Sequence, residues 1–204
     1  MKGFFKRDAY LMLVNTKFYL ICILVLGVLF AAGKTGMSFL GLYVIAFVAS
    51  TLLSLFSYDE QNGWGAYAAA VPGGRKAQVD ARYLVALTVA LAATVLQGMM
   101  YRLSGADGQW AILPLYTGMI LLYISLLFPL TYRFGNKSRL IMLAFIALMG
   151  GVAGAGGAIL HTPGSLGGGD FPLTAASVPL LAVGVVAVAV SHRVSLAIVR
   201  RQEW

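Results

Sequence analysis

Residues 37–57, MSFLGLYVIAFVASTLLSLFS, contain no Asp, Glu, Lys or Arg. A helix needs about 20 apolar residues to cross the roughly 30 Å of hydrocarbon in a bilayer, and this stretch has that length. Five further windows are similarly depleted of charge. The six predicted spans are Thr16–Ala32, Met37–Ser57, Tyr83–Leu103, Trp110–Tyr132, Leu140–Leu160 and Leu173–Leu196.

The composition of the whole chain agrees with these windows. Of its 204 residues, 60% are hydrophobic and 11% are charged, which is too apolar for one soluble core of this size. Backbone groups in lipid must pair within their own segment unless strands close a barrel, and the windows lack the alternation of barrel strands. We therefore predict an all-α integral membrane protein with a single domain over residues 1–204, and not a soluble enzyme.

The basic residues predict the orientation of the spans. If the amino terminus is cytosolic, only Lys34 and Arg102 lie outside. The cytosolic side then holds Lys2, Lys6, Arg7, Lys17, Arg75, Lys76, Arg82, Arg133, Lys137, Arg139, Arg193, Arg200 and Arg201. This asymmetry places both termini in the cytosol. The net charge of +8 is spread over separate loops, so we expect anionic lipid headgroups as its partner and no nucleic acid.

Four segments follow from these assignments. Residues 1–15 are expected to form an interfacial helix, because Phe4, Leu11 and Val14 share one helical face opposite the lysines. Residues 16–57 carry the first two spans, 58–82 form a cytosolic segment, and 83–204 carry the other four spans and a cytosolic tail.

The cytosolic segment predicts a short helix over Trp64–Val71. Asp59 and Glu60 are expected to cap it, and Pro72-Gly73-Gly74 to end it before Arg75. Trp64 and Tyr67 have two interpretations, as anchors in the interfacial aromatic belt or as contacts to a partner. Gly65, Gly73 and Gly74 are expected to loosen the segment.

The sequence offers no candidate residues for catalysis or metal binding. The seven acidic residues fall at predicted membrane edges or in loops, so we expect no buried carboxylate for a proton relay or ion site. His161 and His192 belong to opposite faces, and Cys22 is the single cysteine. We predict no catalytic, cofactor or metal residues, and assign Gly150, Gly151 and Gly154 to close helix packing or dimer contact.

Several segments resemble the small permease subunits of ABC type 2 exporters. The residues that carry the resemblance span the chain in order: Met1-Lys2-Gly3, Lys6-Arg7-Asp8, Tyr58-Asp59-Glu60, Trp64, Tyr67, Pro72, Arg75-Lys76, Tyr83, Phe128-Pro129-Leu130, Tyr132 to Arg139, Ser191 to Leu196 and Arg200 to Glu203. The resemblance implies a six-helix permease that pairs with a second copy or a paralogue. Separate cytosolic ATPase subunits would bind ATP and Mg²⁺, and this chain would hold no cofactor.

The resemblance also implies roles for particular residues. The amino-terminal helix would be the connecting helix, and Trp64–Val71 the coupling helix that binds the ATPase. The implied ATPase contacts are Asp59, Glu60, Trp64, Tyr67, Val71, Pro72 and Arg75. Relatives of this type suggest hydrophobic compounds or amphipathic and antimicrobial peptides as cargo, exported across a bacterial inner membrane. Residues that could line the path, or simply pack in the core, are Tyr43, Phe47, Ser50, Ser54 and Phe145. Because the loop of residues 161–172 is short, we expect the outer re-entrant helix pair of larger relatives to be reduced or missing.

Two rival functions use the same spans. One is an immunity protein that sequesters a toxic peptide in the membrane without ATP. The other is a small channel or secondary carrier, which ranks lower because no ion or proton site is expected in the spans.

Overall fold

A computed structural model describes residues 3–14, 37–103, 113–135 and 173–201, and every regular element in these ranges is a helix. Residues 3–14 form an amino-terminal helix. The elements that follow are α2 (Met37–Gln61), α3 (Trp64–Ala70), α4 (Gly74–Leu103), α5 (Leu113–Phe134) and α7 (Leu173–Arg201).

Three of the described helices are long and apolar enough to cross a membrane, namely α4, α5 and residues Ser177–Arg201 of α7. They coincide with the third, fourth and sixth predicted spans. Helix α2 covers the second predicted span and continues through Asp59 and Glu60 to Gln61. The all-helical membrane class is thus confirmed for the described residues. The first and fifth predicted spans lie outside them, and the total of six stays a prediction.

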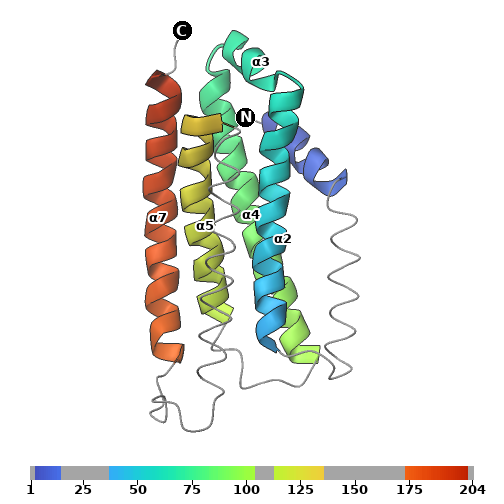
Figure 1. The fold of residues 1–204 in the computed structure, drawn as a ribbon, viewed down its shortest axis with the longest axis vertical. Helices are drawn as coiled ribbons and strands as arrows, with labels where there is room; N and C mark the ends of the chain where they lie inside the picture. The colour runs from blue at the N-terminus through green and yellow to red at the C-terminus, as the bar shows by residue number, and fades with distance from the viewer. Residues whose placement is uncertain (1–2, 15–36, 104–112, 136–172, 202–204) are drawn as a thin grey trace.

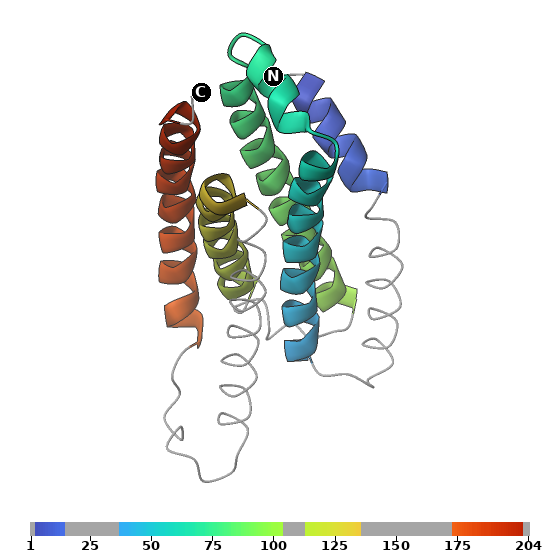
Figure 2. The ribbon, with the colours of Figure 1, turned by 45° about the horizontal axis from the view of Figure 1, so that its top comes forward.

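The long helices stand side by side, and α3 lies across the end where α2 stops and α4 begins (Figure 1). Helix α7 ends at this same end of the bundle, and the amino-terminal helix lies there beside α2 (Figure 2). Helices α5 and α7 run in the same direction, as the predicted order of the fourth and sixth spans requires. We call this the α3 end. It gathers the segments that the sequence places in the cytosol.

The core of the bundle is apolar and aromatic. Val48, Leu52 and Ile124 are fully buried between α2, α4 and α5. Near the α3 end, the ring of Phe128 forms T-shaped contacts with Phe56 and Tyr83, with ring centroids 5.4 Å and 4.5 Å apart. The outer faces of α4 and α7 leave large apolar side chains exposed, as lipid contact requires.

Two glycines bring α5 and α7 into backbone contact. A Cβ atom placed on Gly118 would lie 3.0 Å from the backbone of Leu180 and Leu181, and one on Gly184 would lie 3.0 Å from the Cβ of Leu121. Small residues allow such close approach between membrane helices. The sequence interpretation missed both, because neither has a second small residue four positions away. The predicted packing glycines Gly150, Gly151 and Gly154 lie outside the described residues.

Candidate functional site

Helix α3 is bounded by glycine turns and has no side-chain cap. Gly63 occupies its N-cap position with φ 61°, and no side chain caps the helix. The prediction that Asp59 and Glu60 cap α3 is wrong, because both belong to the last turn of α2. The carboxylate of Asp59 is instead used in the ion cluster described below.

A close backbone contact seats α3 on the start of α4. Ala68 is the buried residue of α3, and a Cβ atom placed on Gly74 would lie 2.5 Å from its carbonyl oxygen. Gly73 precedes this contact with φ 67°, a conformation that glycine adopts without strain. The expectation that Gly73 and Gly74 loosen the segment is therefore wrong. They permit the turn that holds α3 against the bundle.

We expect Gly74→Ala to displace α3, because the added methyl group meets a backbone carbonyl that cannot rotate away. A cost of about 1.4 kcal/mol or more is in the range of overpacking and would raise amide exchange across residues 63–73 about tenfold. Hydrogen exchange measured by mass spectrometry checks this. Gly65→Ala is the control, since its Cβ would meet nothing within 4 Å. Equal amide exchange in the two variants would contradict the close contact between Gly74 and the backbone of α3.

An ion cluster of Arg7, Asp8, Asp59 and Arg82 ties together the amino-terminal helix, α2 and α4. Arg7 lies 3.1 Å from Asp8 and 2.6 Å from Asp59. Arg82 pairs with Asp59, and its Nε lies 3.9 Å from Asp8. Asp8 is 1% exposed and Asp59 8%. Two of the acids that the sequence places at the membrane edges are therefore buried, and two arginines from separate helices accompany them.

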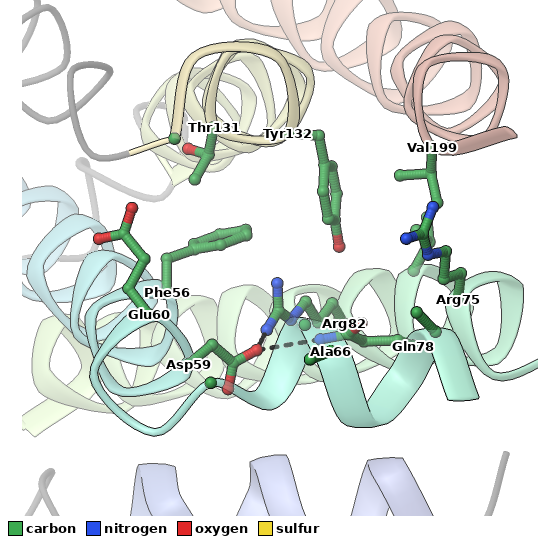
Figure 3. Close-up of a pocket in the computed structure, with 15 residues that line it drawn as sticks. Phe56, Asp59, Glu60, Ala66, Arg75, Gln78, Arg82, Thr131, Tyr132 and Val199 are labelled. Carbon is green, nitrogen blue, oxygen red and sulfur yellow. Dashed lines mark hydrogen bonds and ion pairs between the residues drawn. The ribbon is translucent and has the colours of Figure 1, made fainter. Parts of the chain in front are cut away.

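The cluster is neutral overall and is shielded by aromatic rings. The Arg82 guanidinium lies 4.5 Å from the ring centroid of Phe56 and 5.8 Å from that of Tyr132, and Figure 3 shows it between the two rings. Gln78 donates a hydrogen bond of 3.0 Å to Asp59. Burial raises the pKa of Asp8 even though Arg82 and Arg7 oppose the shift, so ionising this carboxyl costs free energy that the arginines only partly return.

The two aromatic residues of α3 face different surroundings. Trp64 is half-buried, with the Arg7 guanidinium 3.9 Å from its ring centroid and the ring of Phe4 edge-on at 6.2 Å. Tyr67 contacts Trp64 at 4.7 Å but is 55% exposed. Trp64 therefore joins α3 to the amino-terminal helix, whereas Tyr67 points outward.

The amino-terminal helix packs differently from the predicted apolar face. Phe4 and Leu11 are partly buried as expected, but Val14 is 48% exposed. Its most buried residues are Asp8 and Met12, four positions apart on one face. A hydrophobic pattern could not reveal this face, since an acid stands at its centre.

A cavity of about 700 Å³ opens beside the cluster, between α2, α3, α4 and α5. Its lining combines polar groups of Asp59, Gln78 and Arg82 with the rings of Phe56 and Tyr132 (Figure 3). Among the described residues, no group of His, Cys, Asp or Glu could hold a metal ion. These contacts form a joint that connects α3 with the amino-terminal helix, α2 and α4.

A comparison with protein families assigns this architecture. A family model described as ABC-2 family transporter protein matches residues 3–200. The chain belongs to the ABC-2 transporter family. It is thus a multi-pass membrane component of an ABC transporter, a type of subunit that is generally non-catalytic and that associates with ATPase subunits. No curated protein and no solved structure matches it.

The predicted ATPase contacts of this ABC-2 chain gather at the α3 end. Glu60 is exposed at the end of α2, and Pro72 is exposed in the turn after α3. Val71 and Arg75 are half-buried on either side of that turn. Asp59 stands apart, because burial in the ion cluster keeps it from a partner's surface.

The predicted path residues of the ABC-2 chain lie on α2 or outside the described residues. Phe47 is 9% exposed and packs in the core. Ser50 donates its hydroxyl to the Phe47 carbonyl at 3.0 Å, and Ser54 donates to that of Thr51 at 2.8 Å. These two hydroxyls thus have partners in their own helix. The side chain of Tyr43 and the whole of Phe145 lie outside the description.

Sequence reasoning also missed a polar contact between α4 and α7 of the ABC-2 chain. The Tyr83 hydroxyl lies 2.6 Å from that of Ser191 and 2.9 Å from that of Ser195. One turn earlier on α4, Asp80 lies 2.8 Å from Nε2 of His192. His192 therefore has a carboxylate partner, while His161 lies outside the described residues.

Proposed function

We propose that this chain is the permease subunit of an ATP-driven ABC exporter, and that α3 is the helix on which a separate cytosolic ATPase subunit docks. The observation that carries the proposal is the placement of α3. This short helix lies across one end of the bundle and exposes all its residues except the half-buried Trp64 and the buried Ala68 (Figure 2).

The joint beneath α3 supplies a route for force. Trp64 connects α3 to Arg7 of the amino-terminal helix, and Arg7 is paired with Asp59 of α2. Asp59 is in turn paired with Arg82 of α4. A push on α3 by a partner is therefore delivered to three helices at once. Two arrangements of such a packed joint would suit a transporter that alternates between states.

Further parts of the proposal concern cargo and assembly. We propose outward movement of amphipathic or antimicrobial peptides, or similar hydrophobic compounds, by a pair of permease chains, either two copies or this chain with a paralogue. The protein would lie in a bacterial inner membrane with the α3 end in the cytosol. The gathering of Arg7, Arg75, Lys76, Arg82, Arg133, Arg193, Arg200 and Arg201 on segments at or near that end supports this orientation.

Co-purification tests the ATPase contact directly. With the full chain expressed beside its neighbouring genes, we expect Tyr67→Ala to weaken retention of the ATPase subunit about tenfold or more, because an exposed aromatic anchor at an interface typically carries this much. Tyr10→Ala is the matched control, since Tyr10 is 67% exposed on the amino-terminal helix and not on α3. If both variants retain the ATPase equally well, Tyr67 is not the anchor.

Trp64 provides a second, distinct readout. Its Nε1 has no hydrogen-bond partner among the described residues, so Trp64→Phe should keep the stacking on Arg7 and preserve ATPase retention. Trp64→Ala should instead loosen the amino-terminal helix.

If the wild-type chain never retains an ATPase subunit, the exporter proposal fails and the ATP-independent immunity function takes its place.

A further inference from the structure

A basic pocket of about 480 Å³ lies between the start of α4 and the last turns of α7. Arg75 and Lys76 of α4 and Arg200 of α7 line it, with Leu196 and Val199 as apolar walls. Figure 3 shows Arg75 beside Val199, where these two helices meet. None of the described lining residues is acidic. The described walls of the pocket therefore contribute three basic side chains and no carboxylate.

Among the described residues of α4 and α7, the acid is Asp80, and it is already engaged. Asp80, one turn beyond Lys76 on α4, lies 2.8 Å from His192 of α7. Lys76 and Arg200 are exposed, and neither forms an ion pair with another described residue. Like charges gathered in one pocket repel, so an anion bound between them would stabilise the arrangement.

A second pocket of about 570 Å³ lies on the same two helices, one turn further along. Its walls include the apolar side chains of Leu84 and Leu87 on α4 and Val185 and Val188 on α7. Leu84 is 46% exposed and Val185 56%, so this pocket opens to the outer face of the bundle. On both helices the linings continue at helical spacing, from Lys76 through Asp80 and Leu84 and from Arg200 through Leu196 and His192.

We propose that this groove between α4 and α7 binds an anionic phospholipid. The phosphate of the headgroup lies among Arg75, Lys76 and Arg200, and an acyl chain lies against the leucines and valines about two to four helical turns deeper. Both helices are long and apolar enough to cross the membrane, so their common basic end falls at the level of the headgroups. The apolar walls of the second pocket favour a lipid over a soluble anion, and its charged residues Asp80, His192 and Arg193 lie at the end nearer the basic pocket. The lipid would brace Ala68, Ala69 and Val71, which also line the basic pocket.

Native mass spectrometry of the full chain without any partner tests the proposal, using phosphatidylglycerol and phosphatidylcholine as probes. We expect Lys76→Gln combined with Arg200→Gln to weaken phosphatidylglycerol binding about thirty-fold, from a factor of roughly five for each basic group at a membrane surface. Phosphatidylcholine binding should not change. The control combines Arg133→Gln with Arg201→Gln, which removes the same charge near the same end from residues outside both pockets.

Three results would overturn the proposal. Equal loss in the two double variants would show diffuse attraction and no site. Displacement of phosphatidylglycerol by inorganic phosphate would show that the pocket recognises phosphate without the acyl chain. If Lys76→Gln with Arg200→Gln keeps the lipid but loses the ATPase subunit, the pocket serves an acidic surface of that partner. Because the lipid measurement uses this chain alone, failure of the ATPase proposal does not affect it.

Discussion

Replacing Arg82 by Met is expected to lower the free energy of unfolding by about 3–5 kcal/mol, the cost of removing one partner from a buried ion pair. Arg82 is 3% exposed and pairs with Asp59, and it also faces Asp8. Without it, two buried carboxylates share the single positive charge of Arg7. The measurement is thermal or denaturant unfolding of the full chain in detergent micelles, compared with Arg102→Met, which removes an exposed arginine from the other end of α4.

A compensating variant separates charge balance from lost packing. Arg82→Met combined with Asp59→Asn leaves Arg7 and Asp8 as a balanced pair, 3.1 Å apart. We expect this double variant to be more stable than Arg82→Met alone, a coupling of the kind that double-mutant cycles detect between contacting residues. A double variant that is less stable than the single one would show that the aromatic packing of Arg82, and not its charge, holds the joint.

Replacing Gly118 by Leu should separate α5 from α7. The new side chain would begin 3.0 Å from the carbonyl group of Leu180 and the amide nitrogen of Leu181, and a helix backbone cannot move aside as a side chain can. Overpacking of this kind costs about 3 kcal/mol or more when backbone atoms are the obstacle. Unfolding in micelles measures the loss.

The control for the glycine contact is Ala182→Leu on the exposed face of α7. This change also adds a large apolar side chain to a span, but it meets lipid or detergent and should change stability by less than about 0.5 kcal/mol. Similar losses for the two variants would mean that the backbone approach of α5 and α7 does not set the cost.

Much of the membrane architecture followed from residue chemistry alone. Windows with at most one charged residue located α4, α5 and α7 because a span must be both long and apolar, and these requirements leave a strong signal in one sequence. The short helix after Trp64 was also predicted, because Pro72 and the neighbouring glycines mark its end. The N-cap of this helix was not predicted correctly. An acidic residue just before a helix can be taken for its cap, and only the structure shows that Asp59 and Glu60 belong to α2.

The ion cluster could not be predicted in the same way. Arg7 and Arg82 were counted as orientation signals, and Asp8 and Asp59 as membrane-edge acids, because a sequence gives the type of a charge and not its neighbours. Their pairing depends on how three helices meet. Arg7 and Asp59, for example, are 52 residues apart in the sequence. Gly118 and Gly184 were not predicted for a similar reason. Each glycine lies close to the backbone of another helix, and such a contact leaves no pattern in the local sequence.

The ion cluster also constrains how the protein is made. As the chain leaves the ribosome, Arg7 is the first arginine of the cluster, and it is the only one available to Asp8 and Asp59 until Arg82 of α4 is synthesised. Until then the two acids of the cluster outnumber its arginines by one, and this net charge is costly to bury. The amino-terminal helix can therefore reach its balanced, buried arrangement only after the start of α4 has been synthesised.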